Sequence, residues 1–580
     1  MSILRATLAG LFSTVTLPIP PLLVGAKVAT LGDSIIARGH SFTTATTRTT
    51  AQNRGNSELT WARARSPRFI HTNYYDNTAN AANDVPTYAV AYERDNLWRG
   101  ANFGISSDTA LGITRRVQQV INSGAQVCFL SIGTNTDTPN TSVEKIARID
   151  QAVTALTAAN IWVVLGTIRP RWSGERETLT NVLSTTSGSR VVRLTRTGHL
   201  MTNFSNASRE LDFVGAGASI AGLTIQGRIV NGSGGWSVNV VDANTIDITV
   251  PTGQPTANAT ITNGGGSFTY HRNLFIDLAG VANLGLCLMP SDTRHQIHRD
   301  TNDWILTQTG RNRVIVCDMT TALRDPARST ITGVYLEPFS WAIMDGVHAS
   351  ARGAAAGGTV LETALAQIIQ PGVAFNTDPT ISNLLANGNF IGTGGTANQG
   401  MSGTIATNTT VANAQLAGQP VTGVASLESN TDTGGQTCVL AITSAGGGAV
   451  NTFNTIRFSH TNPTIGFTST DWVQGIYEIE TSGMESGILT CFQATIGQSS
   501  TISNRGLGQT RADYNTEPYP IDNRRYWIAT EPLLVETRTS LNLRLDLAIR
   551  TDLAGTVNVR VRRAFIRIVP NPQTQFPWIP

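Results

Sequence analysis

A serine placed directly after an apolar run is the first residue of this sequence that could do chemistry. Val28–Leu31 breaks into Gly32-Asp33-Ser34, so we expect the hydroxyl of Ser34 at the end of a strand. A serine hydroxyl is a weak nucleophile and needs a neighbouring imidazole as its base. Far downstream, Asp345 and His348 are three residues apart, a spacing that lets the carboxylate hold the ring. These three residues predict a catalytic triad and a hydrolase.

Two further segments could supply an oxyanion hole. Gly104 follows a second predicted strand, Ala101–Phe103, and its backbone N–H can face the nucleophile. Asn135 follows a third, Val127–Ile132, and offers a side-chain amide. With the N–H of Ser34, these groups make three donors for a negatively charged oxygen. Taken singly, Gly-Asp-Ser is mostly a turn and Asp-x-x-His arises by chance, so the argument depends on the ordered set.

In this order, the four segments resemble the SGNH (GDSL-type) hydrolase family. The matching residues are Gly32-Asp33-Ser34, Gly104, Gly133-Thr134-Asn135 and Asp345-x-x-His348. The resemblance implies a flavodoxin-like three-layer α/β/α fold and ester hydrolysis through an acyl-serine intermediate, with no metal or other cofactor. It implies that Ser34, Gly104 and Asn135 form the oxyanion hole, that His348 is the base and that Asp345 orients it. In this family, an aspartate usually follows directly after the asparagine of the third matching segment. Here Thr136 follows Asn135, and Asp137 comes one position later. The contacts that support the oxyanion hole are therefore expected to differ from the family's pattern.

The surrounding pattern predicts the scaffold in four parts. Residues 27–372 alternate apolar runs with helical patterns, which predicts a parallel sheet covered on both faces. Residues 215–270 carry short alternating strands and predict a β insertion that walls the site, binds substrate or is purely structural. Residues 376–580 have almost no helical periodicity and predict a jelly-roll-like β-sandwich for carbohydrate binding or oligomerisation. Residues 1–26 read as a docking or extended segment, with a cleaved signal peptide as the alternative.

Several other side chains are weaker candidates. Arg169, Trp172 and Trp341 stand where substrate could be gripped, since tryptophan stacks on sugar rings, but structural packing explains each equally well. His295 and His298 are three residues apart without an evident third ligand, so no metal is expected. The five cysteines show no CxxC spacing and predict neither a disulfide framework nor a zinc site.

Composition excludes two classes of partner. Charged residues make up 14% of the 580-residue chain and the net charge is +3, too small to indicate nucleic acid as a partner. No apolar stretch reaches the length of a membrane-spanning helix.

The preferred interpretation is a serine esterase that removes O-acetyl groups from a bacterial surface polysaccharide. The Thr-, Asn- and Gly-rich β regions favour a bacteriophage tail component in the virion, docked to tail or baseplate proteins and assembled as a homo-oligomer, a trimer if it is a tailspike. Two alternatives stay open. One is a secreted bacterial carbohydrate or lipid esterase with a binding module, and the other is a non-catalytic tail fibre or adhesin that uses the fold as a scaffold.

Overall fold

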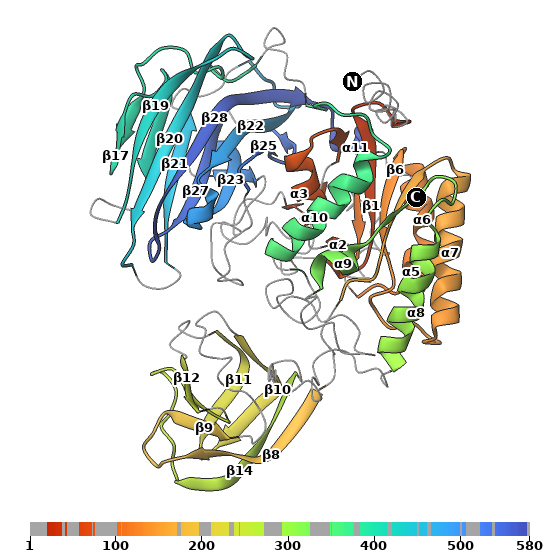
Figure 1. Cartoon of the computed structure of the whole chain (residues 1–580), viewed down its shortest axis with the longest axis vertical. Coiled ribbons are helices and arrows are strands. Elements are labelled where there is room, and N and C mark those ends of the chain that lie inside the picture. The colour runs from red at the N-terminus through yellow and green to blue at the C-terminus, as the bar shows by residue number, and fades with distance from the viewer. Residues whose placement is uncertain are drawn as a thin grey trace, which may run out of the picture.

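The structure is organised around four large β-sheets. The computed structural model describes residues 20–37, 41–42, 57–71, 74–75, 101–105, 107–170, 176–195, 210–230, 237–242, 244–271, 293–324, 349, 351–375, 383–414, 420–448, 452–460, 466–498, 501–505, 522–535 and 540–576. A fifth, two-stranded sheet pairs β2 (Ser41–Phe42) with β4 (Tyr74–Tyr75). Figure 1 shows most of the helices gathered around one large sheet, while the other three belong to all-β regions.

The fold class expected from the sequence is wrong. About twice as many of the described residues lie in strands as in helices, so the protein is mostly β. The alternation of strand and helix is confined to one sheet of six strands, whereas the other three large sheets hold seven, six and seven. A flavodoxin-like three-layer α/β/α class therefore does not describe this chain, because the inserted and C-terminal strands outweigh the part on which the expectation was based.

The sheet that carries the helices is parallel throughout. Its strand order is β15-β7-β6-β1-β3, with β5 also paired to β1. The strands are β1 (Ala26–Gly32), β3 (Phe69–Ile70), β5 (Asn102–Gly104), β6 (Val127–Ser131), β7 (Trp162–Gly166) and β15 (Val314–Cys317). These strands read as near-continuous apolar runs because both faces of the sheet are covered.

Helices cover the two faces. Leu31, Leu130 and Leu165 pack with α5, α6, α7 and α8 on one face. Val28 and Phe129 point to the other face and pack with α3 and α10. The helices are α2 (Ser34–Ala37), α3 (Glu58–Arg65), α5 (Ala110–Arg115), α6 (Val117–Asn122), α7 (Ser142–Ala158), α8 (Thr293–Thr307), α9 (Met319–Leu323) and α10 (Ala351–Ala366).

An antiparallel sheet is inserted between β7 and α8. Its order is β11-β10-β14-β8-β9-β13-β12, and its first strand begins at Arg176, well before residue 215. The side chains of Leu183, Leu194 and Ile246 are buried, and they are register neighbours on the same face of the sheet. The strands are β8 (Arg176–Thr185), β9 (Val191–Thr195), β10 (Glu210–Ile220), β11 (Leu223–Val230), β12 (Ser237–Asp242), β13 (Thr245–Thr249) and β14 (Ile261–His271).

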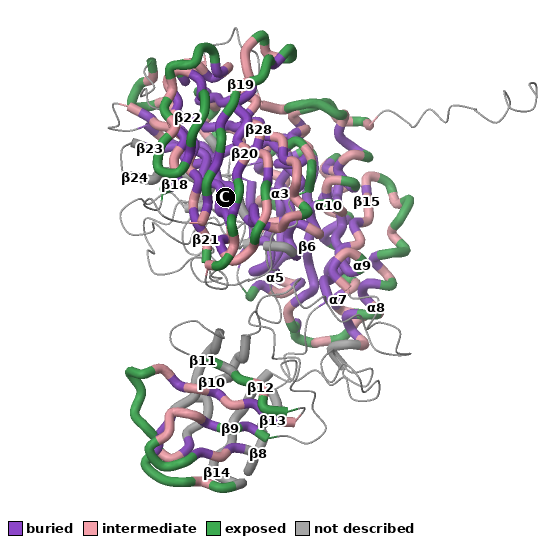
Figure 2. The backbone as a smooth tube through the Cα atoms, turned by 60° about the vertical axis from the view of Figure 1, so that its left-hand side comes forward, coloured by how far each residue is buried: buried purple, intermediate pink, exposed green. Residues whose placement is uncertain are grey.

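The C-terminal part pairs two sheets across an apolar core. Their orders are β16-β18-β21-β27-β23-β24 and β17-β19-β20-β28-β22-β25, with β26 beside β22. Leu543 and Leu545 from one sheet and Val557 and Val559 from the other are fully buried in the same cluster. Figure 2 shows this buried interior, with much of the exposed chain in turns.

The C-terminal elements have the following bounds. The strands are β16 (Thr396–Asn398), β17 (Met401–Gly403), β18 (Thr409–Asn413), β19 (Val421–Asn430), β20 (Gly435–Ala445), β21 (Phe453–His460), β22 (Trp472–Ser482), β23 (Leu489–Gln498), β24 (Thr501–Arg505), β25 (Arg525–Ala529), β26 (Leu533–Leu534), β27 (Asn542–Arg550) and β28 (Ala554–Val569). Two short helical turns, η3 (Met484–Ser486) and α11 (Pro572–Gln575), are also present.

Candidate active site

Ser34 is the first residue of α2 and lies directly beyond the carboxyl end of β1. Asp33 is fully buried, and its Oδ1 accepts a hydrogen bond of 2.9 Å from the backbone N–H of Ile35, which fixes the turn. A Cβ at Gly32 would lie 2.6 Å from the carbonyl oxygen of Ser131, so only glycine fits between the two strands here. The Gly-Asp-Ser sequence thus holds a serine at the edge where open parallel sheets bind ligands.

Gly104 ends β5, and its register partner on β1 is Gly32. The backbone N–H of Gly104 donates to Oδ1 of Asn102 at 3.1 Å. The Nδ2 of Asn102 donates in turn to the carbonyl oxygen of Ile36 at 3.0 Å, which ties β5 to α2. Gly104, the predicted oxyanion donor, therefore lies beside the turn that carries Ser34, and its N–H donates to the side chain of Asn102.

Asn135 lies in the loop after β6, and a single buried lysine fixes that loop. Nζ of Lys145 donates to the carbonyl oxygens of Gly133 at 2.8 Å and Asn135 at 2.7 Å. The side-chain Nδ2 of Asn135 donates to the carbonyl oxygen of Asp108 at 2.8 Å, and an amide nitrogen carries a second hydrogen for another acceptor. The side chain of Asn135 is thus held in one orientation.

Asp137, which the sequence places one position later than the family pattern does, fixes the loop that carries Asn135. Its carboxylate is buried and pairs with Nζ of Lys145 at 3.1 Å and with Nη1 of Arg148 at 2.9 Å. It also accepts the backbone N–H of Leu111 at 3.1 Å, at the start of α5. Asp137 therefore ties the loop after β6 to helices α5 and α7.

Arg116 joins the segments that carry Ser34 and Gly104. It is 1% exposed, and Nη2 donates to the carbonyl oxygen of Gly32 at 3.0 Å while Nη1 donates to that of Phe103 at 2.6 Å. Its Nε donates to Asp108 Oδ2 at 2.9 Å. Burial raises the pKa of Asp108, and the Arg116 charge opposes that rise. We call Arg116 and Asp108 the buried clamp.

The buried clamp contacts all three segments that carry the predicted oxyanion donors, because the carbonyl oxygen of Asp108 also accepts a hydrogen bond from the side-chain amide of Asn135. Sequence reasoning missed Arg116, Asp108 and Lys145 as supporting residues. A signal existed for two of them, since Arg116 interrupts an apolar helical stripe and Lys145 is one of only two lysines in the chain.

The other predicted site residues are distributed as follows. Arg169 is 2% exposed and forms a buried ion pair with Glu58 at 2.7 Å, and its Nη1 donates to Oγ of Ser131 at 2.8 Å. This contact joins α3 to the ends of β6 and β7. The remaining predicted residues, Asp345, His348, Trp172 and Trp341, lie outside the described residues.

The direction of α10 is fixed by its contacts. Near its end, the backbone N–H of Leu22, upstream of β1, donates to the carbonyl oxygen of Ile368 at 2.9 Å. In its first half, a Cβ at Gly357 would lie 3.3 Å from Sδ of Met319, which follows the carboxyl end of β15. Helix α10 therefore begins toward the sheet edge at which Ser34 lies.

None of the helices in the described residues is both long and apolar enough to span a membrane. In the same residues, no three histidine, cysteine, aspartate or glutamate side chains are grouped as metal ligands would be.

No protein-family model matches the sequence, and no curated protein matches it either. Weak likenesses to solved structures do exist. A carbohydrate esterase of family 3 from Talaromyces cellulolyticus is 13% identical, with a TM-score of 0.24 over 59% of this chain and 97% of that one. The enzymatically active domain of bacteriophage CBA120 tailspike protein 4 is 13% identical, with a TM-score of 0.19 over 32% of this chain and 21% of that one.

A structure of carbohydrate-binding modules of the β-sandwich superfamily is 14% identical, with a TM-score of 0.19 over 28% of this chain and 57% of that one. The chain thus spans less than two thirds of the tailspike domain and of the binding module. At these scores the likenesses assign neither a fold nor a function, so the functional argument depends on the site itself.

Proposed function

We propose that the chain is an SGNH-type serine esterase that removes O-acetyl groups from an acetylated polysaccharide of a bacterial surface. The observation that carries the proposal is the buried clamp. Arg116 bonds the segments that bear Ser34 and Gly104, and Asp108 bonds Asn135. Burying an arginine and an aspartate costs free energy unless their geometry is well satisfied. The buried pair of Arg116 and Asp108 would hold three potential oxyanion donors in fixed positions, which is a functional reason to bury these two charges.

The proposed reaction has two half-reactions. The Ser34 hydroxyl attacks the ester carbonyl while His348, oriented by Asp345, takes its proton. The tetrahedral oxygen accepts hydrogen bonds from the backbone N–H groups of Ser34 and Gly104 and from the Asn135 amide. The N–H of Gly104 gives up its bond to Oδ1 of Asn102 when it donates to this oxygen. The sugar hydroxyl leaves with the proton from His348, and acetyl-Ser34 remains. Water, deprotonated by His348, then attacks the acetyl carbon and releases acetate.

The course of α10 supports the choice of base. His348 stands three residues before the first residue of α10, and that helix begins toward the sheet edge of Ser34. A chain entering a helix at this edge can bring an imidazole within reach of the serine hydroxyl.

The setting we propose is a phage tail, with the inserted sheet and the β-sandwich contacting the glycan and the chain assembled as a homotrimer on tail or baseplate proteins. This proposal is supported by the abundance of Thr, Asn and Gly in the β regions that accompany the candidate active site. Arg169 stays a candidate for positioning, through Glu58 and Ser131, and Trp172 and Trp341 stay candidates for sugar contact.

Acetate release tests the proposal. The purified chain is incubated with a panel of O-acetylated bacterial polysaccharides, and free acetate is measured for the wild type and for Ser34→Ala. A matched control, Ser187→Ala, changes an exposed turn of the inserted sheet. The proposal requires release by the wild type and the control and loss by Ser34→Ala. Full turnover by Ser34→Ala would exclude Ser34 as nucleophile, and no turnover of any ester by the wild type would exclude the esterase.

A further inference from the structure

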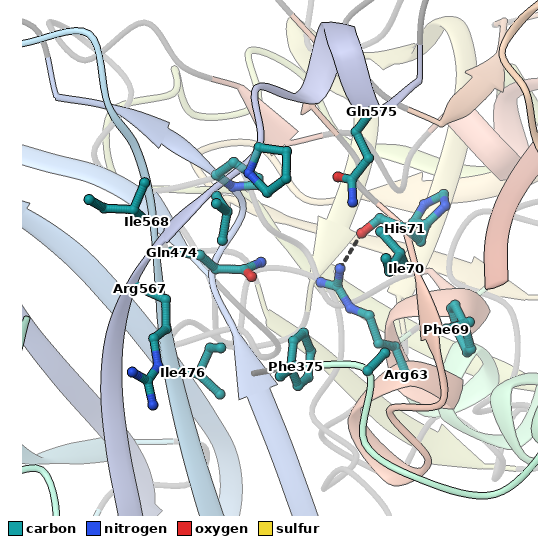
Figure 3. Close-up of a pocket in the computed structure, with 14 residues that line it drawn as sticks. Arg63, Phe69, Ile70, His71, Phe375, Gln474, Ile476, Arg567, Ile568 and Gln575 are labelled. Atoms are coloured by element: carbon teal, nitrogen blue, oxygen red, sulfur yellow. Dashed lines mark hydrogen bonds between the residues drawn. The ribbon is translucent and has the colours of Figure 1, made fainter. Parts of the chain in front are cut away.

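The β-sandwich bonds directly to helix α3 of the parallel-sheet unit. Nη2 of Arg63 on α3 donates to Oε1 of Glu531 at 3.3 Å, and both side chains are buried. Nη1 of Arg63 donates to the carbonyl oxygen of His71, directly after β3. Beside Arg63, a cavity of about 430 Å³ lies between Ile70 and Ile568, as Figure 3 shows. Helix α3 therefore connects the two parts at the edge of a cavity between them.

One arginine of the sandwich contacts two helices at once. Arg524 stands directly before β25, and its Nη2 donates to Oε1 of Glu362 on α10 at 3.2 Å. The same nitrogen donates to the carbonyl oxygen of Arg65, the last residue of α3, at 3.4 Å. The guanidinium of Arg524 lies 5.8 Å from the ring centroid of Tyr526 on β25. Arg524 therefore joins the sandwich to both α3 and α10.

Arg65 extends this connection into α10. Its Nη1 donates to the carbonyl oxygen of Ala355 at 2.7 Å and to Oγ1 of Thr359, both on α10. Its Nη2 lies 3.8 Å from Oδ1 of Asp522 in the sandwich, and its guanidinium lies 5.3 Å from the ring centroid of Trp61. Arg65 is thus held from the sandwich side while it holds the backbone of α10.

Helices α3 and α10 are in close contact at two glycines. A Cβ at Gly358 would lie 2.6 Å from Cβ of Trp61 and 2.9 Å from the carbonyl oxygen of Glu58. A Cβ at Gly357 would lie 2.8 Å from Cγ of Glu58. Glycine allows this approach because it has no side chain. The position of α3 therefore decides the position of α10.

The contact continues to the residue next to the proposed base. Ala349 directly follows His348 in the sequence. It is buried and belongs to the same apolar cluster as Trp61 on α3 and Ala354 on α10. That cluster extends into the core of the sandwich, and Tyr526 on β25 is one of its members. The sandwich is thus packed against the segment by which the chain enters α10.

The end of the chain ties the two parts together a second time. Strand β28 leads from the sandwich to α11, and Phe576 directly follows that helix. Phe576 is buried in the apolar cluster that contains Leu31 and Leu130 of the parallel sheet. Nζ of Lys27 lies 5.8 Å from the centroid of its ring. A shared buried core restricts the relative motion that domains otherwise show.

We propose that the β-sandwich positions the general base of the esterase, with Arg524 and Arg65 as the positioning residues. The inference rests on the proposed function, in which His348 is the base. The ion pair of Arg524 with Glu362 holds α10 from the sandwich, and Arg65 holds it from α3. These contacts fix the place where the chain enters α10 and keep the imidazole within reach of the Ser34 hydroxyl. A displacement of about 1 Å can cost about a hundredfold in rate.

Hydrolysis of p-nitrophenyl acetate by the full chain tests the inference. This ester has no sugar, so a change in glycan binding by the sandwich leaves its turnover unaffected. Arg524→Gln removes the charge that contacts both helices. The matched control is Arg560→Gln, which removes a sandwich arginine of similar exposure, 37% against 32%. The ion pair of Arg560 joins it to Glu428 within the sandwich.

We expect kcat to fall about fivefold in Arg524→Gln, with an unchanged KM, and to stay at the wild-type value in Arg560→Gln. Arg524→Lys keeps a charge near Glu362 and should recover part of the loss. Gly358→Ala drives α10 away from α3 and should lower kcat at least tenfold. Its control, Gly253→Ala, adds a Cβ that would meet no atom within 4 Å in the described part of the chain.

A second measurement separates a displaced base from partial unfolding. Diethyl p-nitrophenyl phosphate reacts once with Ser34, whose oxygen displaces p-nitrophenolate from phosphorus with help from the same base. In Arg524→Gln the rate constant should fall with kcat, while the p-nitrophenolate released stays at one per chain. Near-ultraviolet circular dichroism at the assay temperature confirms that each variant is folded. A lower final amount at an unchanged rate constant would indicate lost protein and contradict positioning.

The two proposals fail in different ways. Turnover by the wild type and its loss in Ser34→Ala support the esterase. With that esterase present, a kcat of Arg524→Gln within twofold of Arg560→Gln, or wild-type turnover by Gly358→Ala, would overturn the positioning role alone. Absence of turnover by the wild type would remove the proposed function and this inference together.

Discussion

His460 should make the β-sandwich sensitive to acid, and the structure gives the size of the effect. Its ring is buried on β21, stacked between Phe390 at 5.9 Å and Tyr477 at 6.1 Å, with Phe458 edge-on at 5.8 Å. In the part of the chain that the structure describes, neither ring nitrogen has a hydrogen-bond partner. Burial lowers the pKa of His460 to about 3.

The sign follows from the two protonation states. The folded state keeps the His460 ring neutral, whereas the unfolded chain binds a proton below its ordinary pKa of about 6.5. Stability from this residue is therefore fully present above pH 6.5 and is lost as the pH falls toward about 3. The complete loss is about 5 kcal/mol, of which about 2 kcal/mol has gone by pH 5, at about 1.4 kcal/mol per pKa unit.

His460→Phe removes the titrating group and keeps an aromatic ring in the stack. Urea unfolding at pH 8 and pH 5 gives the free energy of unfolding of each protein, and hydrogen–deuterium exchange of peptides from β21 assigns the transition to the sandwich. The wild type should lose about 2 kcal/mol more than the variant between these pH values. Equal losses in the two proteins, within about 0.5 kcal/mol, would refute the burial of a neutral histidine here.

Further predictions concern the site and the core. Asn135→Ala should lower kcat/KM for acetyl-ester hydrolysis about 10²–10³-fold and lower the melting temperature only slightly, because one hydrogen bond to Asp108 is lost, and an unchanged rate would remove Asn135 from the oxyanion hole. Arg116→Met leaves the buried Asp108 without its cation and should cost about 3–5 kcal/mol in urea unfolding, while adding Asp108→Asn should recover part of that loss. Gly32→Ala places a methyl group against the neighbouring strand and should lower both the melting temperature and acetate release. Burial raises the pKa of Cys317 to about 12, so iodoacetamide at pH 8 should label it only after urea is added, as read by mass spectrometry.

Local apolar patterns predicted several elements correctly. The runs at 28–31, 101–103 and 127–132 are confirmed as β1, β5 and β6. Such runs are informative because a strand buried on both faces needs apolar side chains at every position. The inserted sheet begins earlier than its pattern suggested, because β8 pairs with β14, some eighty residues away, and has little alternation of its own.

Helix α3 shows why other parts could not be predicted. Its sequence, ELTWARAR, has no apolar stripe, yet all eight residues are buried. Glu58 pairs with Arg169, and Arg63 pairs with Glu531. These partners are distant in the sequence, and a pattern of charged residues by itself indicates an exposed surface. Only the tertiary contacts make the burial of these charges favourable.

The sequence by itself determined the strand–glycine–serine turn and the apolar strands that hold it, because backbone conformation and the burial of apolar side chains depend on neighbouring residues. The tertiary structure alone decided which charged groups are buried together. Arg116 and Lys145 hold the loops of the site because residues from separate strands converge on them. The larger share of strands than helices likewise depends on pairing between strands that are distant in the sequence, and a local sequence pattern does not reveal such pairing.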